Sequence, residues 1–123
     1  MMNTTSADNH KAEEYFAKKN AFTTGPVELS RRIEQEDNIV VIDVRESEDF
    51  RKGHVPGAVN LPEEKWDTLE GLSKEATNVL YCYTQTCHLA SRAAQRFSRE
   101  GYPVMEMEGG FEAWKDSDLE IQK

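Results

Sequence analysis

Short runs of apolar residues alternate with amphipathic segments along most of this chain. The run Ile39–Val44 is almost continuously β-branched, which is typical of a parallel strand buried on both faces. Asn78–Cys82 and Pro103–Met107 have the character of further strands, and Ala58–Asn60 fits a shorter one. Because helical patterns separate these strands, we predict an α/β fold with a mostly parallel sheet and helices on both faces.

Several segments have the pattern or the composition of helices. The first runs from Asp8 to about Asn20 and has one amphipathic face, which we expect to pack on the domain. That face is formed by Ala12, Tyr15, Phe16 and Lys19. A second helix opens at Thr24-Gly25-Pro26, since proline suits the first helical position. The other predicted helices are Ser47–Lys52, Pro62–Leu69, Leu89–Glu100 and a short one from Phe111 to Trp114.

The length of 123 residues fits one domain, which we place at residues 22–118, after a tail and helix at 1–21 and before a tail at 119–123. The net charge of −8 disfavours nucleic acid and anionic membranes as partners. No apolar run approaches the roughly 20 residues of a membrane helix, and no secretory signal is visible at the N-terminus. We therefore expect a cytoplasmic protein with reduced thiols.

The most informative residue is Cys82, at the end of the predicted strand Asn78–Cys82. Ligands of open α/β sheets bind beyond the carboxyl ends of the strands. The following loop and helix N-terminus offer backbone N–H groups, which we expect to lower the pKa of the Cys82 thiol. Such a thiolate can attack a sulfur atom and hold it as a persulfide. The alternative is that Cys82 is only a small buried residue.

Several motifs resemble the rhodanese family. Asp43–Glu46 with Phe50, and then Gly53–Pro62, are similar to the N-terminal signature of rhodanese domains, and Gly109–Trp114 is similar to their C-terminal signature. Val79–Cys82 is similar to the strand that ends in their catalytic cysteine. The resemblance covers about residues 22–117. It implies a five-stranded parallel sheet and transfer of sulfane sulfur, through a Cys82 persulfide, from thiosulfate or a persulfide donor to a thiol or cyanide.

The loop after Cys82 departs from the commonest pattern of the family, Cys-x-x-Gly-x-Arg. It is about two residues longer, lacks both glycine and arginine, and resembles a subgroup with a Cys-x4-Cys loop. We expect the loop to bind the substrate, with Arg92 as a candidate anion contact. Because positive charge is scarce there, we expect the loop to bind the thiosulfate dianion less well, which favours a persulfide as the sulfur donor. The candidate substrate-binding residues of the loop are Tyr83, Thr84, Gln85, Thr86, Cys87 and His88.

Three interpretations of Cys87 remain open. It resolves a Cys82 persulfide or forms a reversible disulfide with Cys82, it is itself the nucleophile, or it takes no part in the chemistry. The position of Cys82 at the strand end favours Cys82 as the nucleophile. A cysteine phosphatase or arsenate reductase needs Cys-x5-Arg, and the sixth residue after Cys82 is His88, which cannot form a bidentate contact with phosphate.

A zinc site is a further alternative for the same loop. Cys82, Cys87 and His88 could supply three ligands, but the chain has no second Cys/His pair at structural-site spacing. We therefore expect neither a metal nor another cofactor. The leading hypothesis is an enzyme that uses small sulfur donors and thiol acceptors. A second hypothesis is a persulfide carrier or redox module that delivers sulfur to a protein partner without free turnover.

Overall fold

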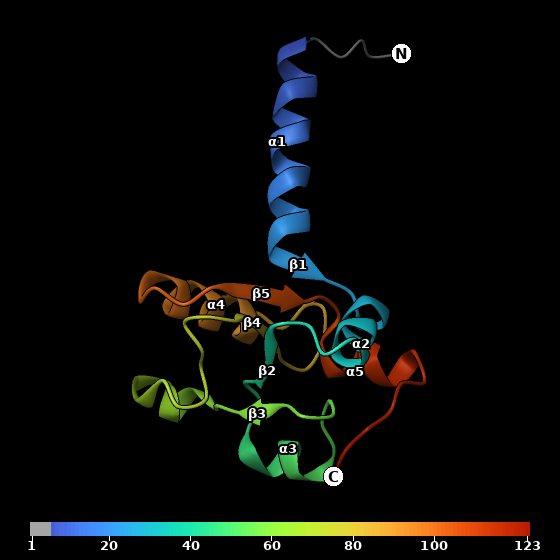
Figure 1. Cartoon of the computed structure of the whole chain (residues 1–123), viewed down its shortest axis with the longest axis vertical. Helices are drawn as coiled ribbons and strands as arrows, with labels where there is room; N and C mark the ends of the chain where they lie inside the picture. Colours follow the sequence, from blue (N-terminus) through green and yellow to red (C-terminus); the bar gives the residue numbers. More distant parts are fainter. Residues whose placement is uncertain (1–5) are drawn as a thin grey trace.

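The computed structural model describes residues 6–123 and contains a five-stranded sheet in the order β1-β5-β4-β2-β3 (Figure 1). Every neighbouring pair of strands is parallel, as the sequence predicts. The strands are β1 (Thr23–Thr24), β2 (Ile39–Asp43), β3 (Val59–Asn60), β4 (Thr77–Tyr81) and β5 (Val104–Met107). Because β4 and β2 lie in the interior of the sheet, their carboxyl ends meet at the middle of one edge.

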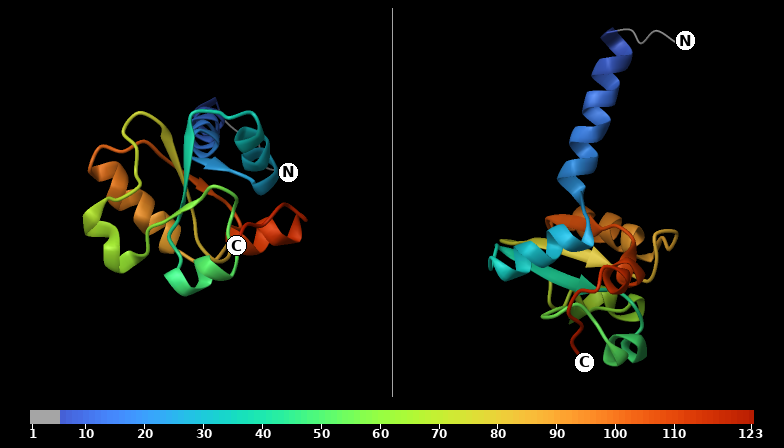
Figure 2. Two further views of the ribbon diagram at one scale, coloured as in Figure 1. Left: turned by 60° about the horizontal axis from the view of Figure 1, so that its bottom comes forward. Right: turned by 90° about the vertical axis from the view of Figure 1, so that its right-hand side faces the viewer.

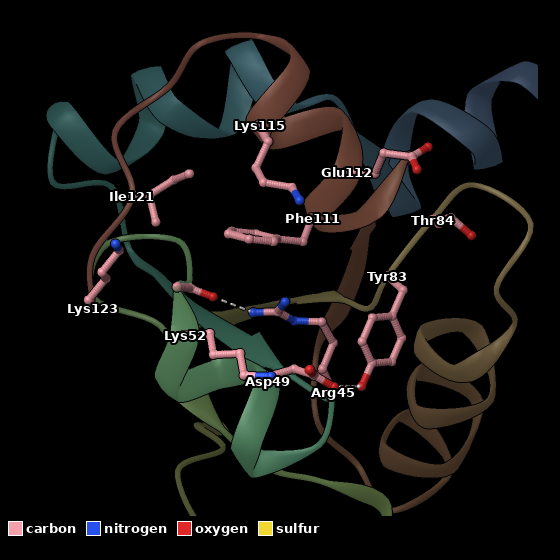
Figure 3. Close-up of a pocket in the computed structure, with 11 residues that line it drawn as sticks. Arg45, Asp49, Lys52, Tyr83, Thr84, Phe111, Glu112, Lys115, Ile121 and Lys123 are labelled. Carbon is pink, nitrogen blue, oxygen red and sulfur yellow. Dashed lines mark hydrogen bonds between the residues drawn. The ribbon is translucent and has the colours of Figure 1, made fainter.

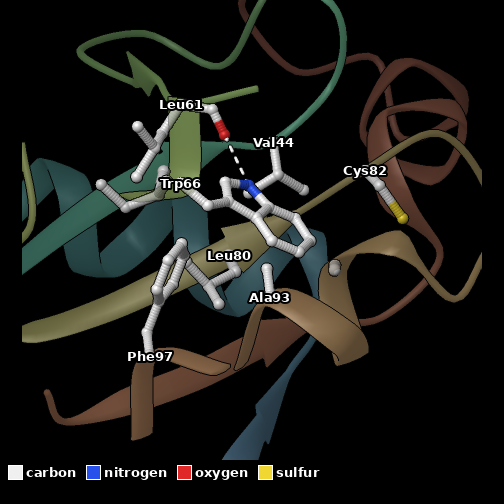
Figure 4. Close-up of a cluster of buried hydrophobic side chains, with 9 residues drawn as sticks. Val44, Leu61, Trp66, Leu80, Cys82, Ala93 and Phe97 are labelled. Atoms are coloured by element: carbon white, nitrogen blue, oxygen red, sulfur yellow. Dashed lines mark hydrogen bonds between the residues drawn. The ribbon is translucent and has the colours of Figure 1, made fainter. Parts of the chain in front are cut away.

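Helices cover both faces of the sheet and bury two separate apolar clusters. The helices of the described chain are α1 (Ser6–Phe22), α2 (Pro26–Glu34), α3 (Ser47–Lys52), the 3-10 helix η1 (Glu63–Thr68), α4 (Leu89–Arg99) and α5 (Gly110–Asp116). On one face, η1 contributes Trp66 and α4 contributes Phe97 to a cluster that also holds Ile42, Leu80 and, at one end, Cys82 (Figure 4). On the other face, α2 and α5 pack against Val41 and Val79. Alternate residues of each central strand therefore face opposite clusters.

Some boundaries differ from those predicted, for local reasons. Strand β4 ends at Tyr81, so Cys82 is the first residue after the strand. The predicted helix at Pro62–Leu69 is the 3-10 helix η1, whose buried Trp66 donates from Nε1 to the backbone oxygen of Leu61 at 3.0 Å. The strand β1 was not predicted, because two residues are too few for a periodic pattern.

Helix α1 projects from the domain and does not lie along it (Figures 1 and 2). Residues 8–18 are all exposed, so the expectation that this helix packs on the domain is wrong for most of its length. Its last turn is attached by an ion pair from Lys19 Nζ to Glu108 Oε2 at 2.8 Å. The apolar side chains of the predicted amphipathic face therefore meet solvent, with Tyr15 61% exposed and Phe16 53% exposed. Within residues 6–123, no helix is long and apolar enough to cross a membrane.

Candidate functional site

Cys82 lies where strand β4 gives way to the loop at residues 83–88. Its side chain is 2% exposed and belongs to the apolar cluster beneath η1 and α4. The thiol donates to the backbone oxygen of Cys87 across the loop, with 3.5 Å between Sγ and the oxygen. The predicted nucleophile is therefore held at the carboxyl end of a central strand, in contact with the residue that carries the second thiol.

The loop closes on itself through a turn, in which the backbone N–H of Cys87 donates to the oxygen of Thr84 at 3.2 Å. Helix α4 then begins at Leu89. Cys87 is half-buried and packs against the same apolar cluster as Cys82, whereas Gln85, Thr86 and His88 are exposed. The structure thus places the two thiols at the inner side of the loop and the three polar side chains in solvent.

The two cysteines differ in acidity. Burial raises the pKa of Cys82 to about 11, and its hydrogen bond with the Cys87 side chain adds to the increase. Burial also disfavours ionisation of Cys87, but the N–H of Leu89, the thiol of Cys82 and the N–H of Tyr83 outweigh it and lower the pKa of Cys87. The expectation that the loop lowers the pKa of Cys82 is therefore wrong. We therefore expect Cys87 to form the first thiolate of this pair.

The N-terminus of α5 fixes the start of the loop through the backbone. The N–H of Phe111 donates to the oxygen of Cys82 at 2.9 Å, and the N–H of Glu112 donates to the oxygen of Tyr83 at 3.0 Å. Gly110 has a φ of +62°, and a Cβ atom there would lie 2.5 Å from the carbonyl carbon of Tyr83. Only glycine permits this approach. The paired glycines were visible in the sequence, but their contact with the loop was not.

Arg92, the predicted anion contact, lies in α4 and is engaged elsewhere. Its Nη1 donates to Glu63 Oε2 at 2.8 Å, and both side chains are largely exposed. Its positive charge still contributes to the lowered pKa of Cys87. Among residues 6–123, no arginine side chain donates a hydrogen bond to the loop, and backbone N–H groups of Tyr83, Leu89 and Ala90 are the donors that favour the thiolates of Cys82 and Cys87.

A buried polar network lies beside the loop, on the other side of Tyr83. Arg45 Nη2 pairs with Asp43 Oδ2 at 2.8 Å, and the Tyr81 hydroxyl donates to the same oxygen at 2.6 Å. The backbone N–H of Val55 donates to the Tyr81 hydroxyl at 3.1 Å. These contacts give Asp43 and Arg45 a structural role at this edge of the sheet. Next to them is a cavity of about 440 Å³ that neither cysteine lines (Figure 3).

Comparison with known proteins adds the following similarities. The family model of the rhodanese-like domain matches residues 25–117 of this sequence. The chain is 33% identical to the BH2092 protein of Bacillus halodurans, whose crystal structure superimposes with a TM-score of 0.86 over 93% of this chain and 85% of that one. It is 28% identical over 92 residues to the thiosulfate sulfurtransferase GlpE of Pseudomonas putida, covering 73% of this chain and 82% of that protein.

The similarity also extends to part of a larger protein of another class. The chain is 32% identical over 97 residues, or 78% of its length, to the HTH-type transcriptional regulator Rv0324 of Mycobacterium tuberculosis. It spans 42% of that regulator and 52% of a Synechocystis relative, so it matches about half the length of these two proteins.

The close approach of α5 to the loop predicts a specific effect of substituting Gly110. We expect Gly110→Ala to lower the free energy of unfolding by about 2–4 kcal/mol, because it adds both a strained left-handed residue and a backbone clash. Gly57→Ala is the matched control: its φ is +81°, but no atom lies within 4 Å of the added Cβ. It should cost only the strain, about 1 kcal/mol. Urea unfolding measures both, and equal losses would contradict the proposed contact.

The acidity of the two thiols predicts which of them ionises first as pH rises. A lowered pKa means that Cys87 becomes thiolate below the ordinary pKa of a thiol, whereas Cys82, whose pKa is raised, needs a higher pH. We expect alkylation by iodoacetamide, followed by peptide mass mapping, to give a lower midpoint for Cys87 than for Cys82. Comparing the midpoints of the two pH profiles, not the rates, removes the effect of burial on access of the reagent to each thiol. A lower midpoint for Cys82 would refute the assignment.

Proposed function

The chain belongs to the rhodanese-like domain family, and from this premise we propose that it is a sulfurtransferase that carries sulfane sulfur as a persulfide on Cys82. The observation that carries the proposal is the position of Cys82 directly after the central strand β4, where its thiol donates across the loop to the backbone oxygen of Cys87. The similarity to thiosulfate sulfurtransferases is in keeping with this chemistry.

The pairing of the thiols supplies a route for the proton. In the first step the sulfur of Cys82 attacks the outer sulfur of a persulfide R–S–SH, and the proton of Cys82 passes to the Cys87 thiolate. The S–S bond of the donor breaks and RS⁻ leaves, so the products are Cys82–S–SH, RS⁻ and neutral Cys87. Cys87 thus acts as the general base, a role that suits the thiol of lower pKa.

The second step reverses the movement of the proton. An acceptor thiolate attacks the outer sulfur of Cys82–S–SH, and the new persulfide leaves while Cys82 regains the proton from Cys87. The backbone N–H groups of Ala90 and Tyr83 favour the charged form of the Cys82 sulfur. They stabilise the negative charge that develops on this sulfur when its bond to the transferred atom breaks.

The scarcity of positive charge at the loop favours a persulfide over thiosulfate as the donor. A dianion gains most from a guanidinium, and Arg92 is paired with Glu63. The same feature argues against phosphoryl transfer, because the position that would need arginine is His88, and its side chain is exposed.

The test of this proposal is the site of sulfur loading. We expect wild-type protein incubated with glutathione persulfide to gain the mass of one sulfur atom, as read from intact mass under non-reducing conditions. Cys87→Ser should still be loaded, but more slowly because it lacks the base, and Cys82→Ser should not be loaded. Parallel incubation with thiosulfate should load wild type less completely. Sulfur retained on Cys82→Ser would overturn the assignment of the nucleophile.

A further inference from the structure

Helix α1 presents three aromatic side chains to solvent on one side of the helix. Tyr15, Phe16 and Phe22 are 61%, 53% and 57% exposed, and the first two rings contact each other edge to face, with 5.0 Å between their centroids. These three residues form the aromatic face of α1. The helix projects from the domain (Figures 1 and 2), although most of the stability of a protein helix comes from the packing of one face. A covering surface is therefore expected for the aromatic face.

The foot of α1 is held to the edge of the sheet. Lys19 Nζ pairs with Glu108 Oε2 at 2.8 Å, and the hydroxyl of Thr23 donates to the backbone oxygen of Lys19 at 2.5 Å. Thr23 itself belongs to β1 and pairs with Glu106 of β5. These contacts fix the direction in which α1 leaves the domain, so the aromatic face has a defined orientation relative to the sheet.

A groove of about 380 Å³ lies at the foot of the helix. It is lined by Phe22, by Ala94 and Ser98 of α4, and by Val104 and Met105 of β5. Strand β1 pairs with only the last two residues of β5, which leaves the first two without a strand beside them on this side. Because Phe22 belongs both to the groove and to the aromatic face, the two form one continuous surface.

The groove also holds a carboxylate that lacks a partner. Glu106 lines it and is half-buried, and its side chain forms neither a hydrogen bond nor an ion pair with residues 6–123. Burial and the nearby Glu108 raise the pKa of Glu106, and His88 offsets only part of this increase. A buried carboxylate is costly unless a cation pairs with it. The groove therefore suits a partner that brings apolar surface and a positive group together.

Helix α1 has this combination of groups. Lys11 and Lys18 flank the aromatic face, and within the described chain neither forms an ion pair. The three lysines of α1 balance its three acidic residues, so the net charge of −8 belongs to the rest of the chain. The helix of a second copy can therefore approach the acidic domain without the repulsion that an acidic helix would meet.

We propose that two copies of this chain associate about a two-fold axis, with the aromatic face of each α1 in the groove of the other copy and its flanking lysines beside Glu106. Since face and groove are continuous through Phe22, they form one self-complementary surface, which a two-fold axis closes after two copies. Each copy then covers one helix and one groove of its partner. The inference is independent of sulfur transfer, because none of these residues lies in the loop at residues 83–88.

Sedimentation equilibrium of the full chain tests this association. We expect wild type to be a dimer, and Tyr15→Ser/Phe16→Ser to raise the dissociation constant more than about a hundredfold, because four aromatic side chains leave the interface. The matched control Val27→Ser/Ile121→Ser replaces two apolar side chains that are 45% and 38% exposed elsewhere, and it should remain a dimer. Amide spectra confirm that each variant is folded. A monomeric wild type, or equal dissociation of both variants, would overturn the proposal.

An exchange of charges tests whether α1 of one copy contacts the groove of the other. Glu106→Lys alone and Lys11→Glu/Lys18→Glu alone should each raise the dissociation constant about tenfold, because each brings like charges together in both halves of the dimer. All three substitutions combined should return the constant to within about threefold of wild type. This recovery cannot arise within one chain, since α1 projects away from its own domain (Figure 1). Additive weakening in the combined variant would refute the contact.

Discussion

The close backbone contact between the start of α5 and the loop after β4 is the constraint on which the rest of the site depends. Two hydrogen bonds, from Phe111 to Cys82 and from Glu112 to Tyr83, tie the loop to the helix. They form only because Gly110 has no side chain at the point of closest approach. The same contact places Phe111 over Arg45 and so builds one wall of the neighbouring cavity. Loop, thiols and cavity are therefore parts of one arrangement.

Within that arrangement, burial and backbone N–H groups give the two thiols different acidities. Cys82 is enclosed by the apolar cluster under α4, which raises its pKa and, in the proposed transfer, would shield a persulfide from solvent. Cys87 lies nearer the surface, where backbone N–H groups at the beginning of α4 favour its thiolate. In the proposed transfer, a buried Cys82 next to the more acidic Cys87 would take up sulfur without first forming a free thiolate. The missing loop arginine is then consistent with a donor of low charge.

The sequence was sufficient for features that depend on local pattern. The β-branched run at Ile39–Val44 and the strand before Cys82 predicted the parallel sheet, and the signature motifs predicted its connections. The order of acidity of the cysteines could not be predicted, because it depends on which thiol the apolar cluster encloses and which one α4 reaches with its N–H groups. The cavity beside the loop could not be predicted from the sequence for a similar reason. Arg45, Tyr83, Phe111 and Lys123 are far apart in the chain, and only the tertiary fold brings them together.

The most direct test of the central claim is turnover, with cyanide as an acceptor that needs no binding pocket. The measurement is the steady-state release of thiocyanate from glutathione persulfide and cyanide, corrected for the rate without protein. Transfer through a Cys82 persulfide predicts catalytic release by wild type, a slower rate for Cys87→Ser and only the uncatalysed rate for Cys82→Ser. A wild-type rate in Cys82→Ser would contradict the account, and so would the absence of turnover in wild type.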